Sequence, residues 1–311
     1  MLLKTSLAII SALVTVAQAQ VPPLNVSGDV AVHDPTLCKD KNGKYFIFST
    51  APGIAIRTSM DRTSWTFEGT IWPNGAPWTD AYTGQSNGNL WAPECYYTGS
   101  EFLVWYAASS MGSQKSAIFL ARSSTGAPGS FTNLGLVTST STGNNYNAID
   151  PSVFVDNGNW NFALGSFWTG IKYMTLDPSK GKPSNSSVTA LARRTAAGGA
   201  VEGSTIYKYG NYYYLFTSWD KCCQGTSSTY NIRVGRSSNV NGGYVDKSGV
   251  ALTSGGGTLV LGSHGNVIGP GGQFVYTDSD GPILVYHYYT PYGSQLGIDH
   301  LNFSSGWPVV A

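Results

Sequence analysis

Residues 202–218 read EGSTIYKYGNYYYLFTS, and this stretch indicates the fold more clearly than any other. An acidic start is followed by an apolar run, a turn at Tyr209-Gly210 and a second run rich in tyrosine. Aromatic and β-branched residues on both sides of a Gly-containing turn are typical of two antiparallel strands. The stretch therefore predicts one β-hairpin that begins at Glu202.

Four further stretches repeat this arrangement. They begin at Asp34-Pro35, Trp91-Ala92-Pro93-Glu94, Asp150-Pro151 and Pro270-Gly271, with turns at Asn42-Gly43, Thr98-Gly99, Asn157-Gly158 and Asp280-Gly281. The copies are spaced by roughly 50 to 70 residues, a period typical of propellers and other repeat arrays. We therefore expect an all-β fold, a five-bladed β-propeller with one blade per copy. A β-sandwich would also contain short strands and turns, but it gives no reason for five similar hairpins.

The first 19 residues have the features of a secretory signal peptide. Lys4 precedes a short apolar stretch, and the small residues Ala17 and Ala19 form a candidate cleavage site. A membrane anchor is the competing interpretation, but a bilayer-spanning helix needs about 20 apolar residues and this run is shorter. We expect residues 1–19 to be removed, residues 20–311 to form a single domain, and the mature protein to be secreted and extracellular.

The charge of the chain gives it no attraction for a polyanion. It has 18 basic and 17 acidic residues, and charged residues make up only 11% of the sequence. We therefore expect neither nucleic acid nor a membrane as a partner, and a neutral partner fits better. No oligomer interface can be recognised, so a monomer is the default expectation. Asn25, Asn185 and Asn302 begin Asn-X-Ser sequons, which are candidate glycan sites in a eukaryotic protein although such short matches also arise by chance.

Four cysteines in a secreted chain allow three pairings. We favour a bridge between Cys38 and Cys95, because each lies in the first strand of its hairpin and neighbouring hairpins can bring them together. Cys222 and Cys223 are adjacent, so they either form a vicinal disulfide or stay free. A zinc site is less favoured, because adjacent cysteines lack the usual ligand spacing and no histidine lies beside them.

In a propeller, equivalent positions of the blades lie around one axis, so the starts of the innermost strands converge at the mouth of the channel. Asp34, Glu94, Asp150 and Glu202 lie near the starts of four copies. An isolated Asp-Pro pair is more often a turn starter that uses an Asx hydrogen bond, but repetition in register favours a shared site. We therefore expect these carboxylates to approach one another.

Converging carboxylates suit the cleavage of a glycosidic bond. The leaving oxygen needs a proton from one side while a nucleophile arrives from the other, so two carboxyl groups are required. One of them must stay protonated near neutral pH, which burial or a neighbouring negative charge brings about. A third carboxylate therefore has a physical purpose.

From about Val30 onward the chain resembles glycoside hydrolase family 43, and within it the fungal secreted endo-1,5-α-L-arabinanases. The motifs that carry the resemblance are His33-Asp34-Pro35-Thr36, Leu90-Trp91-Ala92-Pro93-Glu94, Asn147-Ala148-Ile149-Asp150-Pro151-Ser152, Gly165-Ser166-Phe167-Trp168, Val201-Glu202-Gly203-Ser204 and Val234-Gly235-Arg236-Ser237. In this order they are highly specific.

The resemblance implies a catalytic domain that inverts the anomeric carbon. It makes Asp34 the general base and Glu202 the general acid. Asp150 is then the residue that raises the pKa of the acid and orients it. It also implies that the substrate is arabinan, a side chain of pectin, cleaved at internal α-1,5-arabinofuranosyl bonds or supplied as arabino-oligosaccharides. An exo-acting arabinofuranosidase or β-xylosidase of the same family is the first alternative. A non-catalytic carbohydrate-binding propeller is the second, although it would not need three carboxylates.

Sugar sites combine aromatic platforms with a few hydrogen-bonding groups. The candidate contacts are the platforms Trp91, Phe167 and Trp168, the hydroxyl partners Asn147 and Ser166, and Glu94, which we expect to order the cleft without reacting. A single aromatic residue in a β-protein more often belongs to the core, and the polar candidates could equally serve turns and strand ends. Trp91 is the strongest platform, because its family counterpart lines the cleft.

Many relatives carry a histidine in a Gly-Pro-Gly-His sequence that helps to hold a calcium or similar ion through waters in the central channel. This chain has Gly272 at that position, followed by Gln273. A bound calcium is therefore in doubt, although Gln273 could bind a water or a monovalent ion. We expect His264 and His287 to be structural, assign no metal ligand, and expect no cofactor to be required for the chemistry.

Overall fold

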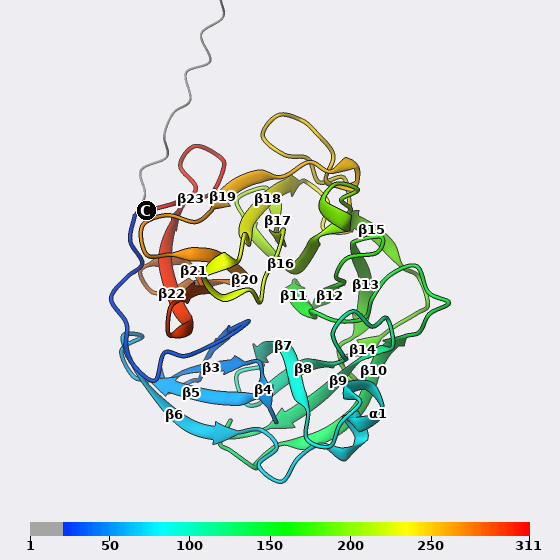
Figure 1. Cartoon of the computed structure of the whole chain (residues 1–311), viewed down its shortest axis with the longest axis vertical. Coiled ribbons are helices and arrows are strands. Elements are labelled where there is room, and N and C mark those ends of the chain that lie inside the picture. Colours follow the sequence, from blue (N-terminus) through cyan, green and yellow to red (C-terminus); the bar gives the residue numbers. More distant parts are fainter. Residues whose placement is uncertain (1–20) are drawn as a thin grey trace, which may run out of the picture.

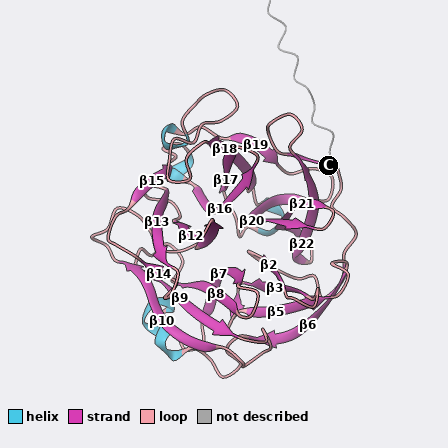
Figure 2. Cartoon of the chain, turned by 180° about the vertical axis from the view of Figure 1, so that it is seen from behind, coloured by secondary structure: helices cyan, strands magenta, loops and turns pink. Residues whose placement is uncertain are grey.

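The computed structural model describes residues 21–311, and the proposed signal peptide at residues 1–19 lies outside them. Five sheets stand around a common axis like the blades of a propeller (Figure 1). In Figure 2 the strands make up the ring, and the short helix α1 (Asp80–Thr83) lies at its outer edge beside blade 2. The predicted five-bladed β-propeller is confirmed, and the sandwich alternative is excluded.

Blades 1 and 2 each contain five strands and differ in where those strands come from. Blade 1 has the order β1 (Ser27–Gly28), β6 (Ser64–Thr70), β5 (Ala55–Ser59), β3 (Tyr45–Ser49) and β2 (Thr36–Lys39). Blade 2 has the order β10 (Thr132–Thr140), β9 (Ser116–Ser123), β8 (Phe102–Ala108), β7 (Asn89–Tyr97) and β4 (Ala51–Pro52). Because β4 leaves the chain of blade 1 to pair with β7, it ties the first two blades together.

Blades 3 to 5 are each built from one continuous stretch of chain. Blade 3 contains β11 (Ser152–Asp156), β12 (Asn159–Leu164), β13 (Ile171–Asp177), β14 (Lys182–Pro183) and β15 (Thr189–Ala192). Blade 4 contains β16 (Val201–Tyr209), β17 (Tyr212–Trp219), β18 (Asn231–Ser237) and β19 (Thr258–Leu261). Blade 5 contains β20 (Ile268–Asp278), β21 (Gly281–Thr290), β22 (Gly293–Asn302) and β23 (Val309–Val310).

All five predicted hairpins are present, as the pairs β2–β3, β7–β8, β11–β12, β16–β17 and β20–β21. In the stretch that opened the sequence analysis, Tyr209 pairs with Tyr212 across the predicted turn. The first strand of each hairpin faces the axis, where it contacts the first strands of the two neighbouring blades. The predicted convergence of these strand starts is therefore confirmed.

Each innermost strand has a residue with left-handed backbone dihedrals just before it or within it, at a matching position. These residues are Asp34 (φ 47°), Ala92 (φ 39°), Asp150 (φ 55°), Gly203 (φ 57°) and Gly272 (φ 57°). Left-handed dihedrals are uncommon for residues other than glycine, and they change the direction of the chain at the mouth of the channel. The repeat is thus geometric as well as sequential. In blade 4 a glycine takes the left-handed position, so the carboxylate comes from the preceding residue.

The core lies between the blades, because each of five buried clusters combines residues from two neighbouring sheets. Phe48 of blade 1 packs against Phe102 of blade 2, and Trp65 of blade 1 shares a cluster with Ile298 of blade 5. The predicted disulfide between Cys38 and Cys95 is confirmed, with a Cα–Cα distance of 6.0 Å, and joins β2 to β7.

Blades 1 and 5 close the ring without sharing a strand. The amide of Leu24 donates to the carbonyl of Ile298 at 2.9 Å, and the amide of Leu296 donates to that of Val30 at 2.8 Å. Asp278 of blade 5 accepts from Lys39 and Arg62 of blade 1. We call this contact region the seam. Within residues 21–311 no helix is long and apolar enough to cross a membrane.

Candidate active site

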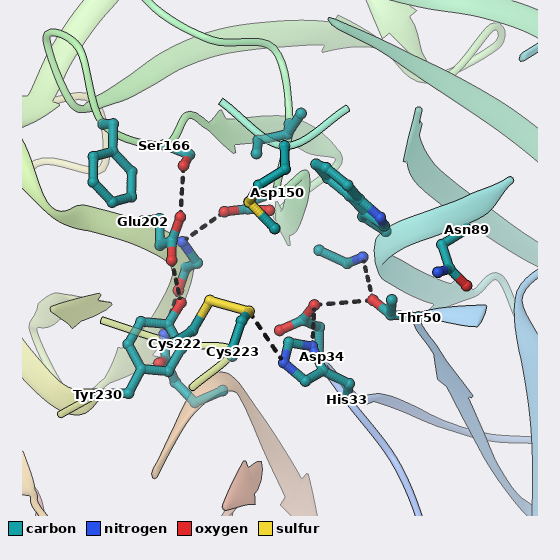
Figure 3. Close-up of a pocket in the computed structure, with 18 of the residues that line it drawn as sticks. His33, Asp34, Thr50, Asn89, Asp150, Ser166, Glu202, Cys222, Cys223 and Tyr230 are labelled. Atoms are coloured by element: carbon teal, nitrogen blue, oxygen red, sulfur yellow. Dashed lines mark hydrogen bonds and ion pairs between the residues drawn. A yellow bond between two sulfur atoms is a disulfide. The ribbon is translucent and has the colours of Figure 1, made fainter. Parts of the chain in front are cut away.

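A cavity of about 1120 Å³ opens at the mouth of the channel and is lined by residues from all five blades. All nine residues singled out from the sequence line it: Asp34, Trp91, Glu94, Asn147, Asp150, Ser166, Phe167, Trp168 and Glu202. Figure 3 shows Asp34 on one side of the cavity and Glu202 with Asp150 on another. The structure thus brings the predicted set together in one site.

Asp34 is held by hydrogen-bond partners from blades 1 and 5. Its Oδ2 lies 2.8 Å from His33 Nδ1 and accepts a hydrogen bond from the Thr50 hydroxyl at 2.9 Å. Its own amide donates to His287 Nδ1 at 3.0 Å. Burial opposes ionisation, but His33, His287 and Thr50 outweigh it and hold the pKa of Asp34 well below its ordinary value. Asp34 is therefore a carboxylate throughout the neutral range.

Glu202 receives two hydroxyl groups instead. Ser166 Oγ donates to Oε2 at 2.6 Å, and the Tyr230 hydroxyl donates to Oε1 at 2.7 Å. Asp150 is held by the amide of Gly203, which donates to its Oδ2 at 3.1 Å. The chain turn that positions Glu202 thus also fixes its carboxylate neighbour.

Glu202 and Asp150 share a negative environment. Burial raises the pKa of Glu202, and the charge of Asp34 adds to this while the two hydroxyl groups oppose it. Burial also raises the pKa of Asp150 well above its ordinary value, and repulsion from Glu202 and Asp34 adds to it. Because two neighbouring carboxylates resist double ionisation, the pair retains a proton to higher pH than either group would alone. The site therefore combines one carboxyl group that favours ionisation with two that favour protonation.

The predicted aromatic residues offer surfaces to the cavity to different extents. Trp168 is 39% exposed and follows Phe167, and both residues have left-handed dihedrals that turn them towards the opening. Trp91 lies half-buried in the cavity wall. These three rings can take the apolar face of a sugar.

Two of the predicted polar contacts differ in their freedom to bind. Asn147 is 3% exposed, lines the cavity, and its Oδ1 has no hydrogen-bond partner. An unpaired buried acceptor is costly, so a ligand hydroxyl would satisfy it. Glu94 is engaged instead, because Oε1 accepts from the Val153 amide at 2.9 Å and Oε2 from Thr36. Burial raises the pKa of Glu94 to about 8, and its contacts tie blades 1, 2 and 3 together.

One cluster in the described chain has the composition of a metal site. Ligand atoms of His33, Asp34 and His287 lie within 4.8 Å of one another. However, His287 Nδ1 accepts the Asp34 amide, and the Asp34 carboxylate already accepts from His33 and Thr50. These three residues do not fit a directly coordinated cation. At Gly272, a Cβ would lie 2.4 Å from Asp34 Oδ1, so a histidine there would collide with the cluster.

Sequence reasoning missed several residues of the site. His33 belongs to the His33-Asp34-Pro35-Thr36 motif, but nothing in the sequence indicated that it contacts the Asp34 carboxylate. His287 was expected only to be structural. Tyr230 and Tyr289 line the cavity as well. The adjacent Cys222 and Cys223, whose state the sequence left open, form a disulfide in the cavity wall. Tyrosines are so common in these strands that no sequence signal marks the two that reach the site.

Comparison with known proteins identifies the family. The model of glycosyl hydrolases family 43 matches residues 24–308. The chain belongs to this family. A probable arabinan endo-1,5-α-L-arabinosidase A from Aspergillus flavus is 40% identical over the full length of both chains. The extracellular endo-α-(1→5)-L-arabinanase 1 of Bacillus subtilis is also 40% identical, over 89% of this chain and 87% of that one.

A solved structure named for exo action is also similar to this chain in fold. The exo-1,5-α-L-arabinanase from a bovine ruminal metagenomic library has a TM-score of 0.85 and 33% identity, and the match covers 92% of this chain and 99% of that chain. Family membership therefore fixes the fold and the class of reaction. The position at which a polymer is cut depends on features beyond the common fold.

Proposed function

We propose that this family 43 protein is an inverting endo-acting arabinanase, which hydrolyses internal α-1,5-L-arabinofuranosyl bonds of arabinan. The observation that carries the proposal is that one cavity brings together Asp34, whose neighbours favour its ionised form, and the buried Glu202 and Asp150, whose pKa values are raised. Glycoside hydrolysis needs this combination of base and acid. The names of the curated relatives supply the substrate class.

In the proposed reaction, Asp34 accepts a proton from a water as that water attacks the anomeric carbon. Glu202 gives its proton to the glycosidic oxygen, so the bond from the anomeric carbon to the leaving sugar breaks as the bond to water forms. The product has inverted configuration, and one proton has passed to Asp34 and one from Glu202. Ser166 and Tyr230 hold the Glu202 carboxyl group in place during the transfer.

Asp150 keeps a proton available to this acid. Its carboxylate repels a second negative charge on Glu202, and the Gly203 amide fixes its position. Trp91, Phe167 and Trp168 would hold the sugar rings, while Asn147 Oδ1 would accept a hydrogen bond from a sugar hydroxyl.

The second candidate is exo action on the same polymer. It is favoured by one observation, the strong similarity to a structure named an exo-1,5-α-L-arabinanase. Against it, the cavity is lined by residues as far apart as Ser110–Ser113 of blade 2 and Gly293 and Ser294 of blade 5, which suits an internal stretch of polymer.

Hydrolysis of linear arabinan separates these functions. Reducing ends, viscosity and product lengths are followed from the first minutes. Endo action gives a rapid loss of viscosity and a mixture of lengths. Arabinose or one fixed short product from the outset would establish exo action, and the absence of any new reducing ends would remove the enzymatic proposal.

Secretion and a monomeric state belong to the same proposal. One relative is named as extracellular, and the two disulfides suit an oxidising compartment. Asn25, Asn185 and Asn302 are all exposed, as glycan attachment requires. Size-exclusion chromatography and intact mass of the secreted protein test all of these points.

A further inference from the structure

The disulfide between Cys222 and Cys223 lies beside the proposed catalytic base. It lines the cavity in the loop after β17, and Cys223 Sγ is 3.7 Å from His33 Nε2 (Figure 3). The reaction described above does not use it. Its position next to the histidine that contacts Asp34 calls for a physical explanation.

The hydroxyl group of Tyr289 connects this loop to the base. It accepts the Cys223 amide at 2.8 Å and lies 2.9 Å from His33 Nε2 and 3.2 Å from His287 Nε2. Asp34 lies at the other end of both histidines, through Nδ1 of each ring. A single phenol oxygen therefore joins the disulfide loop to both histidines, and the Ser228 side chain contacts it as well.

His287 must donate to Tyr289. Its Nδ1 accepts the Asp34 amide, so that nitrogen carries no proton. Burial keeps the pKa of His287 well below its ordinary value, so the ring is neutral and its proton is on Nε2. The rings of His287 and His33 are stacked 3.9 Å apart, an arrangement that also opposes a charge on both.

The remaining directions follow from the capacity of the phenol oxygen. A hydroxyl group has two lone pairs and one hydrogen. In the neutral form of His33, the lone pairs of the phenol oxygen receive the hydrogens of Cys223 N and His287 Nε2, and its own hydrogen points to His33 Nε2. His33 Nδ1 then donates to Asp34 Oδ2 at 2.8 Å. Burial opposes a charge on His33, but Asp34 outweighs it and raises the pKa of His33. The Cys223 amide thus helps to orient the His33 ring that faces Asp34.

The disulfide holds that amide in place. Cys223 has a φ of 64°, in the left-handed region that residues other than glycine rarely adopt. Cys223 and Gln224 are both exposed, so little packing restrains the loop. A covalent ring between two adjacent side chains restricts the backbone torsions between them, and opening it frees the Cys223 amide to leave Tyr289.

From this geometry we infer that the Cys222–Cys223 disulfide is a positioning element for Asp34, acting through Tyr289 and His33. The inference rests on the proposed role of Asp34 as general base. The disulfide should therefore affect the rate of the chemical step, measured as kcat. The disulfide between Cys38 and Cys95 lies in the core between two blades and should affect only stability.

The first experiment compares Cys222→Ala/Cys223→Ala with the matched variant Cys38→Ala/Cys95→Ala. The first variant should lower kcat on linear arabinan by about 10- to 100-fold, the effect of losing one hydrogen bond to a charged group, with KM changed less than about twofold. The second should lower the melting temperature and keep kcat at 25 °C. A full kcat in a folded Cys222→Ala/Cys223→Ala variant would overturn the inference.

A double-mutant cycle tests the route through Tyr289. Tyr289→Phe removes the hydroxyl group through which the disulfide acts, so adding Cys222→Ala/Cys223→Ala to Tyr289→Phe should cause almost no further loss. Independent, multiplying losses would show that the disulfide does not act through Tyr289 and would contradict the inference.

Reduction of the unmodified protein gives a test that needs no variant to fold. A phosphine reductant should open the accessible Cys222–Cys223 bridge first, as mass spectrometry of alkylated peptides would show, while buried Cys38–Cys95 stays closed. The same loss of kcat is expected, and full activity after reduction would refute the inference. Asp34→Asn tests the proposed base separately from the disulfide. If Asp34→Asn is inactive while the reduced enzyme is fully active, only the role of the disulfide is refuted. If Asp34→Asn is active, the role of Asp34 as general base is refuted as well.

Discussion

Blade 1 and blade 4 each bring one carboxylate to the same cavity and treat it in opposite ways. Asp34 of blade 1 faces two imidazole rings, whereas Glu202 of blade 4 faces hydroxyl groups and the carboxylate of Asp150. Burial opposes ionisation of both residues. The neighbours therefore decide the outcome: histidines favour the charged form at Asp34, and negative charge favours the protonated form near Glu202. The proposed base and the proposed acid are therefore similar groups in different surroundings.

The largest effect should come from removing the base. Asp34→Asn should lower kcat by about 10³-fold both on arabinan and on an aryl arabino-oligosaccharide with a good leaving group, because the attacking water needs a base in both reactions. Initial rates on the two substrates measure this. Asp177→Asn, outside the cavity, is the control. A variant of Asp34 that retains a tenth of the activity would contradict its role.

Removing the acid should separate the two substrates. Glu202→Gln should lower kcat on arabinan by about 10³-fold, but on a dinitrophenyl arabino-oligosaccharide by only about tenfold, because that leaving group departs without a proton. The same rate assays apply. Equal losses on both substrates would mean that Glu202 is not the proton donor.

Asp150→Asn should weaken the acid without removing it. Loss of the Asp150 charge lowers the pKa of Glu202, so its proton is lost at lower pH and the alkaline limb of kcat/KM moves towards acid. At neutral pH the rate should fall by about 10²-fold. The pH profile on arabinan checks the direction, and an alkaline limb that stays in place or moves upward would rule out Asp150 as the residue that tunes the acid.

The smallest effect should come from Tyr230→Phe, which should move the alkaline limb in the opposite direction to Asp150→Asn. Tyr230→Phe removes a hydrogen bond that favours the ionised form of Glu202, so the pKa of Glu202 rises and the alkaline limb moves to higher pH. The rate should fall about 3- to 10-fold, the value of one neutral hydrogen bond. Tyr207→Phe, whose hydroxyl contacts Thr277 outside the cavity, is the control. A limb that moves the same way in Tyr230→Phe and Asp150→Asn would contradict the comparison between the blades.

Much of the fold was accessible from the sequence because a hairpin is a local structure. Turns such as Asn42-Gly43 and the runs beside them depend on neighbours in the chain, and all five predicted hairpins are present. The carboxylates were accessible for the same reason, since each stands at the start of a copy. The sequence did not reveal that the carboxylate of blade 4 comes one residue before the left-handed position. Glu202 and Asp34 look equivalent until the left-handed dihedrals of Gly203 are known.

The partners of the carboxylates depend on contacts between distant segments. Tyr230 lies 28 positions from Glu202, and His287 lies 253 positions from Asp34. Neither distance corresponds to a period of the sequence, so one of many tyrosines and one of four histidines could not be singled out. The Cys222–Cys223 pair was visible, but its effect depends on Tyr289 in another blade.

The seam has a consequence for the synthesis of this protein. Asp34 is among the first residues of the folded domain to be made, while His287 and Tyr289 belong to the last blade. A nascent chain that has completed four blades already contains the proposed acid and its neighbours, but Asp34 still lacks His287, and His33 still lacks Tyr289. Hydrolytic activity should therefore begin only when the ends of the ring meet, so an incomplete or C-terminally clipped chain would hold sugar without cutting it.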